Sequence, residues 1–261
     1  MVGRWSLRVA SMLVLGFLYV PIAIIFLYSF NGERAQSWPI HTLTTRYYDL
    51  ALQNTGFRDA LVLSLQAGLG ATVLALVLGT LAALAVHRFH FFGRDTVSFA
   101  LVLPLALPGI ITGIALGTTI NTLGIPFGLI TIVAGHATFC VVVVYNNVIA
   151  RLRRTSRSLE EASMDLGADA LQTFRHVTLP VIGTALLAGG MLAFALSFDE
   201  IIVTNFTAGT DQTLPIWIFS NIKLANQRPI VNVVAVFVIL LSAVPVYLAQ
   251  RFAGAGAART R

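Results

Sequence analysis

The sequence predicts an all-α protein that crosses a membrane six times. Hydrophobic residues make up 57% of the 261 residues and charged residues only 11%, whereas a soluble domain averages about 45–50% and about 25%. The apolar residues gather in runs of about 20 or more with little or no charge, long enough to cross a hydrocarbon core of about 30 Å. Because a lipid-exposed backbone must satisfy its hydrogen bonds within the segment, these runs are expected to be helices. The composition excludes a soluble globular fold.

Six such runs predict the spans in order. The first follows Arg4 and Arg8 and is longer than the apolar core of a signal peptide, about 7–15 residues, so we interpret it as an uncleaved span. The predicted spans cover residues 9–30, 61–86, 97–122, 127–150, 181–206 and 230–250 of a single transmembrane domain, 1–261.

Three spans carry residues that indicate contact with protein as well as lipid. The second has small residues at helical spacing, among them Gly68 and Gly79, which let another helix approach closely. The third contains Pro104 and Pro108 and should be kinked or broken, either for packing or to line a pathway. In the fourth, we expect His136 to bond a neighbouring helix rather than to carry protons.

The basic residues predict the orientation. Twelve arginines lie in the two tails and in the second and fourth loops, against five basic residues in the other three loops. By the positive-inside rule both termini are expected in the cytoplasm. The net charge of +6 therefore indicates membrane topology, and no nucleic-acid partner is expected.

The fourth loop, residues 151–180, predicts two short helices. Ser158-x-x-Glu161 and Asp169-x-x-Gln172 both have the pattern of a capping box. Gly167 can adopt the left-handed conformation that ends the first helix, and Pro180 is expected to close the second helix where the next span begins. The apolar face of this pair needs a partner, which could be lipid headgroups, since arginines lie between 151 and 157, or another protein.

Part of this loop follows a pattern of fixed spacing. Glu161-Ala162-Ser163, Gly167 and the segment 177–180, Val-Thr-Leu-Pro, match E-A-A-x3-G-x9-I-x-L-P, with Ser for the second Ala and Val for Ile. The loop therefore resembles the EAA motif of inner-membrane permease subunits of binding-protein-dependent ABC importers. The resemblance implies a type I (MetI-like) permease fold and a loop that inserts into a groove on an ATPase subunit. It assigns the ATPase-coupling role to Glu161, Ala162, Gly167, Leu171, Phe174, Leu179 and Pro180.

The residues themselves also indicate that any ATP hydrolysis takes place in another subunit. The only lysine is Lys223 and no Gly-Lys-Ser/Thr is present, so a Walker A phosphate loop cannot be built. We therefore expect a non-catalytic subunit without cofactor or metal. The resemblance implies as partners a dimeric ABC ATPase, a second permease subunit that is a different chain, and a substrate-binding protein outside a bacterial inner membrane.

Further resemblance narrows the family to permeases of spermidine/putrescine importers. It rests on several short stretches taken together in order: Ser29-Phe30-Asn31, Tyr47-Tyr48-Asp49, Leu103-Pro104-Leu105, Ser197-Phe198-Asp199-Glu200 and Thr213-Leu214-Pro215. Permeases for ferric iron, thiamine or sulfate share the loop and the six-helix core, and remain alternatives. A gradient-driven secondary transporter is a further alternative, although the spans show no relay of acidic and histidine side chains.

The carboxylates of Asp199 and Glu200 predict the cation pathway. Asp199 lies 19 residues beyond Pro180, roughly 28 Å along a helix, in the outer part of the fifth span. A polyamine's ammonium groups would compensate a carboxylate there, beside aromatic walls such as Phe198 and Trp217. Since adjacent helical residues point about 100° apart, we expect Asp199 to face the pathway, and Glu200 to make a second cation contact or to pair with an arginine of the neighbouring subunit. Both could instead be interfacial residues that reach water.

Overall fold

The computed structural model describes residues 2–34 and 36–257, with side chains over 5–34 and 36–242. The regular elements of these residues are helices, together with one isolated bridge between Asn31 and Leu43. The helices form two compact units, Met1–Asp59 with Trp217–Arg261 and Ala60–Ile216, which we call unit 1 and unit 2. One continuous helix, α3 (Thr55–Arg88), runs through the boundary. The interpretation as a single domain stays a prediction.

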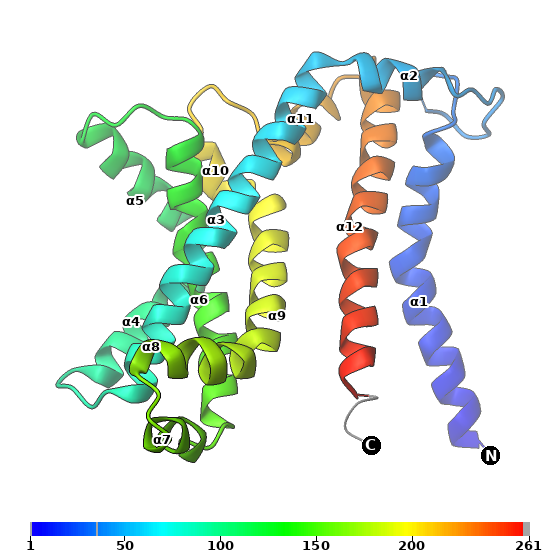
Figure 1. Cartoon of the computed structure of the whole chain (residues 1–261). Coiled ribbons are helices and arrows are strands. Elements are labelled where there is room, and N and C mark those ends of the chain that lie inside the picture. Colours follow the sequence, from blue (N-terminus) through cyan, green and yellow to red (C-terminus); the bar gives the residue numbers. More distant parts are fainter. Residues whose placement is uncertain (1, 35, 258–261) are drawn as a thin grey trace. The chain divides into compact units, whose positions relative to one another are not determined.

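Unit 1 is built on two long helices. Helices α1 (Val2–Tyr28) and α12 (Arg228–Ala257) lie side by side (Figure 1), and the short α2 (Arg46–Gln53) packs on α12. Tyr48 of α2 contacts both neighbours: its hydroxyl lies 2.8 Å from the hydroxyl of Ser29, which directly follows α1, and its ring packs edge-on against Phe237 of α12. Helix α11 (Leu214–Asn221) enters unit 1 at Trp217.

Unit 2 has a core of three packed helices, α3, α6 (Leu129–Arg153) and α9 (Leu179–Phe198). Small residues bring their backbones together, as the sequence predicts. A Cβ on Gly79 of α3 would lie only 2.9 Å from the carbonyl oxygen of Val141 in α6, and one on Gly189 of α9 would lie 3.3 Å from the Cα of Val144. Side chains larger than hydrogen would therefore force these helices apart.

The third predicted span is broken, as its prolines indicate. Helices α4 (Arg94–Ala106) and α5 (Gly109–Thr122) meet at an angle of 104° around Pro108. In Figure 1 they lie at opposite ends of unit 2. Helix α5 packs against α10 (Ile202–Thr207), where Gly113 and Gly117 leave space for Phe206.

The fifth predicted span is wrong in its bounds. A single helical stretch runs from Ala170 to Phe198, so it begins before Val181. It then stops at Asp199, and after a short break α10 begins at Ile202. The predicted continuous helix to Phe206 is therefore not formed.

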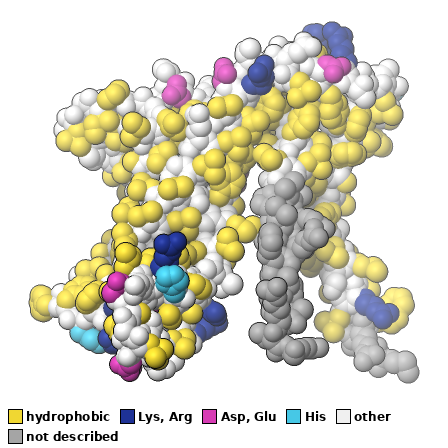
Figure 2. Space-filling view, viewed as in Figure 1, with side chains coloured by type: hydrophobic (Ala, Val, Ile, Leu, Met, Phe, Trp, Pro, Cys, Tyr) yellow, Lys and Arg dark blue, Asp and Glu magenta, His cyan; other side chains and the backbone are white. Residues whose placement is uncertain are grey.

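The helices suit a membrane. Four described helices are long and apolar enough to cross it, and the bent pair α4–α5 makes a fifth candidate. The sixth predicted span lies in α12. The residues of this helix whose side chains are described form an apolar stretch, Arg228–Ser242. On the face of unit 2 seen in Figure 2, apolar side chains cover the middle and charged side chains gather at the ends.

Candidate functional site

The fourth loop forms the predicted helix pair. Helix α7 (Ser158–Asp165) is followed by Gly167 in the left-handed conformation, with φ of 89°, and by α8 (Ala170–Thr173). The Asp169 carboxylate accepts the Gln172 backbone N–H at 2.8 Å, and the Gln172 side-chain oxygen accepts the Asp169 N–H at 2.9 Å. The second capping box is confirmed.

The first capping box is wrong. The residue before α7 is Arg157, already in the helical conformation and without a side-chain cap. Ser158 is inside the helix, and its N–H donates to the hydroxyl of Ser156 at 3.3 Å. The Glu161 carboxylate lies 3.7 Å from the Arg157 guanidinium instead of reaching back to the Ser158 N–H. The Glu161 N–H, which the pattern assigned to the Ser158 hydroxyl, donates to the Arg157 carbonyl at 3.2 Å instead.

The end predicted at Pro180 is also wrong. Helix α8 continues through a π-helical turn, η1 (Phe174–Thr178), directly into α9. The Leu179 N–H donates to the Phe174 carbonyl, five residues back. Proline breaks a regular helix because it lacks an N–H and its ring meets the preceding turn. Here a wider π-turn ends at Thr178, two residues before Pro180, and the helix continues without interruption.

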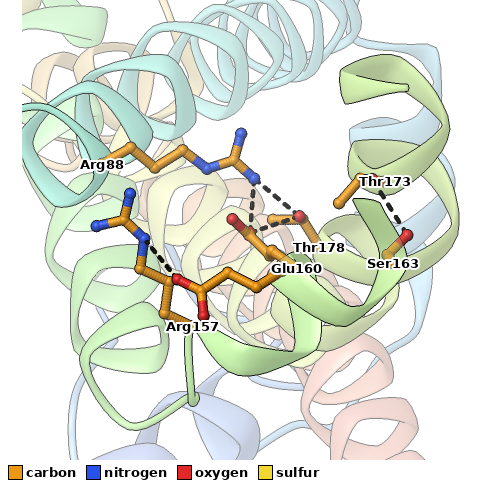
Figure 3. A network of polar contacts seen from close by, with 7 residues as sticks. Arg88, Arg157, Glu160, Ser163, Thr173 and Thr178 are labelled. Atoms are coloured by element: carbon orange, nitrogen blue, oxygen red, sulfur yellow. Dashed lines mark hydrogen bonds and ion pairs between the residues drawn. The ribbon is translucent and has the colours of Figure 1, made fainter. Parts of the chain in front are cut away.

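Three polar side chains fasten α7 to the rest of unit 2 (Figure 3). A guanidinium nitrogen of Arg88, the last residue of α3, donates to the Glu160 carboxylate at 2.6 Å and to the Thr178 hydroxyl at 2.9 Å. The Thr178 hydroxyl in turn donates to the same Glu160 oxygen at 2.7 Å. We call these residues the Arg88–Glu160–Thr178 triad. A charge-assisted triangle of this kind holds its partners more tightly than neutral hydrogen bonds would.

The triad lies in a partly dry environment. The side chains of Arg88 and Glu160 are 27% and 21% exposed, and Thr178 is buried. Partial burial by itself raises the pKa of Glu160, but the hydrogen bonds from Arg88 and Thr178 and the arginine's charge outweigh it, so the pKa is lowered from its ordinary value. Glu160 is therefore ionised at neutral pH and keeps the ion pair.

A second contact holds α7 to α8. The hydroxyls of Ser163 and Thr173 lie 3.1 Å apart, and Thr173 is buried (Figure 3). Ser163 stands where the EAA pattern has its second alanine, so this departure from the pattern has a partner in the structure. Glu160 and Ser163 are three residues apart, which places both on one face of α7.

The other predicted coupling residues lie mostly on the surface. Glu161, Ala162, Gly167 and Pro180 are exposed, Leu171 is 74% exposed, Leu179 is 38% exposed, and Phe174 is half-buried. Leu166, which directly follows α7, is 90% exposed. The helix pair thus turns its polar contacts inward, and its large apolar side chains have no partner among the described residues.

A buried histidine holds the break between α9 and α10. His136 of α6 bonds Ser197 of α9 through Nδ1 at 2.6 Å and Thr204 of α10 through Nε2 at 2.7 Å. Its predicted role as a helix-to-helix bond is confirmed. The Thr204 hydroxyl also donates to the Glu200 carbonyl at 2.8 Å. These bonds fix both sides of the break in the interior of unit 2.

The two predicted pathway carboxylates differ in their surroundings. Asp199 is exposed at the C-terminal end of α9, whereas a Glu200 carboxylate oxygen accepts the N–H of Val203 at 2.9 Å and so satisfies a free donor at the start of α10. The two are not consecutive residues of one helix, so the expected 100° separation does not apply.

The two predicted aromatic walls lie in different units. Phe198 is half-buried and stacks on Phe194 of the same helix, with ring centroids 5.7 Å apart. Trp217 belongs to unit 1, is 5% exposed, and packs on Phe57 at 5.9 Å. Its ring is part of the interior of unit 1, which is a packing role that the sequence reasoning did not anticipate.

Sequence reasoning missed Arg88, Thr178, Ser197 and Thr204. Arg88 was counted only as a positive charge at the end of a span. Thr178 and Ser197 stand in stretches that carry the family resemblance, but those stretches indicate no bonding partner, and Thr204 lies in an apolar run without a motif. A polar side chain inside an apolar run is a signal that a buried partner exists, but it does not say where in the chain the partner lies.

Known proteins resemble this chain over most of its length. The profile of the family described as "Binding-protein-dependent transport system inner membrane component" matches residues 75–255. The chain is 36% identical to the putrescine transport system permease protein PotI of Escherichia coli strain K12, over 87% of this chain and 84% of that protein. It is 32% identical to the spermidine/putrescine transport system permease protein PotC of the same strain, over 97% and 96%.

Solved structures resemble the fold. A bacterial ABC transporter involved in the import of the acidic polysaccharide alginate contains a chain that superposes with a TM-score of 0.75 at 19% identity, covering 97% of this chain and 95% of that one. A chain of the MetNI methionine ABC transporter, in an inward-facing conformation, gives a TM-score of 0.61 at 18% identity, covering 82% and 99%. The all-helical permease fold is confirmed, and the chain belongs to the family of binding-protein-dependent transport system inner membrane components.

Proposed function

We propose that this chain is a permease subunit of a binding-protein-dependent ABC importer for polyamines and that α7 and α8 dock on its ATPase. The observation that carries the proposal is the apolar surface of this helix pair, which has no partner among the described residues: Leu166 is 90% and Leu171 74% exposed. Glu160 meanwhile ties α7 to Arg88, and Ser163 ties α7 to α8. Exposed apolar groups beside polar ones are typical of protein interfaces.

Polyamines are the proposed substrate class. Asp199 is an exposed carboxylate at the end of α9, where the last carbonyl groups of a helix also carry partial negative charge. An ammonium group is stabilised by both. The names of the relatives PotI and PotC, which refer to putrescine and spermidine, support the same class.

The importer has further parts. The proposed complex contains an ABC ATPase dimer, a second permease subunit that is a different chain, and a substrate-binding protein on the opposite side of the membrane. Both termini and the α7–α8 loop face the cytoplasm in this arrangement. The excess of arginines in the tails and in the second and fourth loops supports this orientation.

Reconstitution tests the proposal. The chain is co-expressed with its neighbouring transport subunits, purified, and placed in proteoliposomes, and the uptake of radiolabelled putrescine is measured with ATP inside and loaded binding protein outside. Wild type should retain the ATPase and take up putrescine. Leu171→Asp should lose most of the ATPase, since a charge on a docking surface must be desolvated without a partner.

The matched control is Phe92→Asp, which places the same charge at a fully exposed apolar residue in another loop. This variant should retain the ATPase. Equal retention in Leu171→Asp and wild type would contradict docking through the helix pair. Uptake of sulfate instead of putrescine would overturn the substrate class.

A further inference from the structure

The position of α7 depends on few attachments. The helix has eight residues, and isolated helices of that length are not stable in water. It packs on α8 and η1, and its inward face contributes Glu160 and Ser163. The Ser163 bond reaches only α8, the next helix along the chain. Its side-chain link to α3 among the described residues is the Glu160–Arg88 pair.

The Arg88–Glu160–Thr178 triad connects three elements at one point. Arg88 ends α3, Glu160 lies in α7, and Thr178 is the last residue of η1, directly before α9. Each member bonds the other two, at 2.6, 2.7 and 2.9 Å. Because the triangle is closed, α7 cannot shift against either α3 or the start of α9 without breaking a charge-assisted bond.

The neighbouring glutamate is attached differently. Glu161 is exposed and has only a distant partner, Arg157, four residues earlier at 3.7 Å. Exposed pairs of this type contribute little. The two adjacent carboxylates of α7 therefore separate two tasks, with Glu161 directed to the surface and Glu160 to the inside of unit 2.

We propose that the Arg88–Glu160–Thr178 triad is the positioning link through which a displacement of α7 moves α3 and α9. The inference rests on the proposed function, since it assumes that an ATPase displaces α7. Breaking the triad should leave the ATPase bound but should uncouple ATP hydrolysis from uptake. The apolar surface of the helix pair remains available for docking when the triad is broken, whereas the connection to the two core helices is lost.

The test measures the number of putrescine molecules taken up per ATP hydrolysed, with the complete importer in proteoliposomes. Glu160→Gln and Arg88→Gln should each lower this ratio about tenfold, in keeping with the loss of a charge-assisted hydrogen bond. Thr178→Val, which keeps the shape of the side chain, should lower it less. A variant that only folds poorly reduces the number of working complexes, so uptake and hydrolysis fall together and the ratio is unchanged.

Matched controls remove exposed charges from the same end of unit 2. Asp95→Asn and Arg153→Gln change exposed residues of α4 and α6 and should leave the ratio at the wild-type value. The double variant Glu160→Gln/Arg88→Gln should be no worse than the more severe single variant, because either change already opens the triangle. Multiplied effects in the double variant would show two independent roles and overturn the proposal.

The outcomes separate this proposal from the proposed function. A wild-type complex that binds no ATPase or takes up no putrescine overturns the proposed function. If wild type couples hydrolysis to uptake, and Glu160→Gln and Arg88→Gln leave the number of putrescine molecules per ATP unchanged, only the proposal for the triad is overturned. Loss of the ATPase from Glu160→Gln also overturns it, since Glu160 would then act in docking and not in transmission.

Discussion

Asp199 and Glu200 are neighbours in the chain but make different contacts. Glu200 uses a carboxylate oxygen to accept the Val203 N–H, and its carbonyl accepts the Thr204 hydroxyl. Asp199 is exposed. The Glu200 carboxylate therefore stabilises the start of α10 by accepting its backbone N–H, whereas the exposed Asp199 carboxylate is available for a cation.

The first prediction follows from this difference. Asp199→Asn removes the charge and keeps the shape, so we expect the maximal rate of putrescine uptake to fall about tenfold or more, as for the loss of one hydrogen bond to a charged group. Glu200→Gln keeps an oxygen that can accept the Val203 N–H and should have a smaller effect. Uptake is measured in proteoliposomes with saturating loaded binding protein. Undiminished uptake in Asp199→Asn would remove this carboxylate from the pathway.

Helix packing in unit 2 depends on the absence of side chains at particular glycines. Gly79 of α3 faces the backbone of α6, where an added Cβ would lie 2.9 Å from the Val141 oxygen and 3.0 Å from the Tyr145 nitrogen. Backbone atoms cannot rotate away as a side chain can. Gly183 in α9 has no atom within 4 Å of such a Cβ, although both glycines are helical.

The second prediction compares these two positions. Gly79→Ala should destabilise the protein by about 1–3 kcal/mol through overpacking, while Gly183→Ala should be neutral or stabilise it by up to about 1 kcal/mol, because alanine favours a helix. The measurement is the midpoint temperature for loss of the monodisperse protein in detergent. Equal midpoints for the two variants would show that α3 and α6 do not pack through Gly79.

For the whole molecule, import requires that α7 and the loop after α1 lie on opposite sides of the membrane. The sequence predicts this arrangement from the distribution of arginines. The chain has one cysteine, Cys140, which is buried in unit 2. Cysteines introduced at exposed loop positions can therefore be read without interference from the native thiol.

The third prediction uses two such positions. A membrane-impermeant thiol reagent should label Leu166→Cys only in inside-out vesicles, since the predicted topology places the loop of α7 and α8 in the cytoplasm. It should label Leu43→Cys, which replaces an exposed residue in the first loop, only in right-side-out vesicles. Wild type provides the background. Labelling of both variants from the same side would contradict the predicted topology.

Short-range features of the site could be predicted from the sequence. Asp169 and Gln172 form their capping box, and Gly167 has positive φ, because both depend on residues within one or two turns. Pro108 also marks the broken third span, since proline limits the backbone wherever it occurs. The errors at Ser158 and Pro180 are local as well: a competing serine and a π-turn changed the expected helix ends by a few residues.

The break after Phe198 could not be predicted in this way. Residues 197–202 contain neither glycine nor proline, so nothing in their own sequence ends the helix. His136 lies 61 residues before Ser197 and 68 before Thr204, and it bonds both sides of the break. Glu200 accepts the Val203 N–H that the break leaves free. The Arg88–Glu160–Thr178 triad is of the same kind, with partners 72 and 90 residues apart. Apolar length and local caps act along the chain and are visible in it, whereas hydrogen bonds between distant helices depend on how the helices pack, because only packing brings their polar atoms within reach.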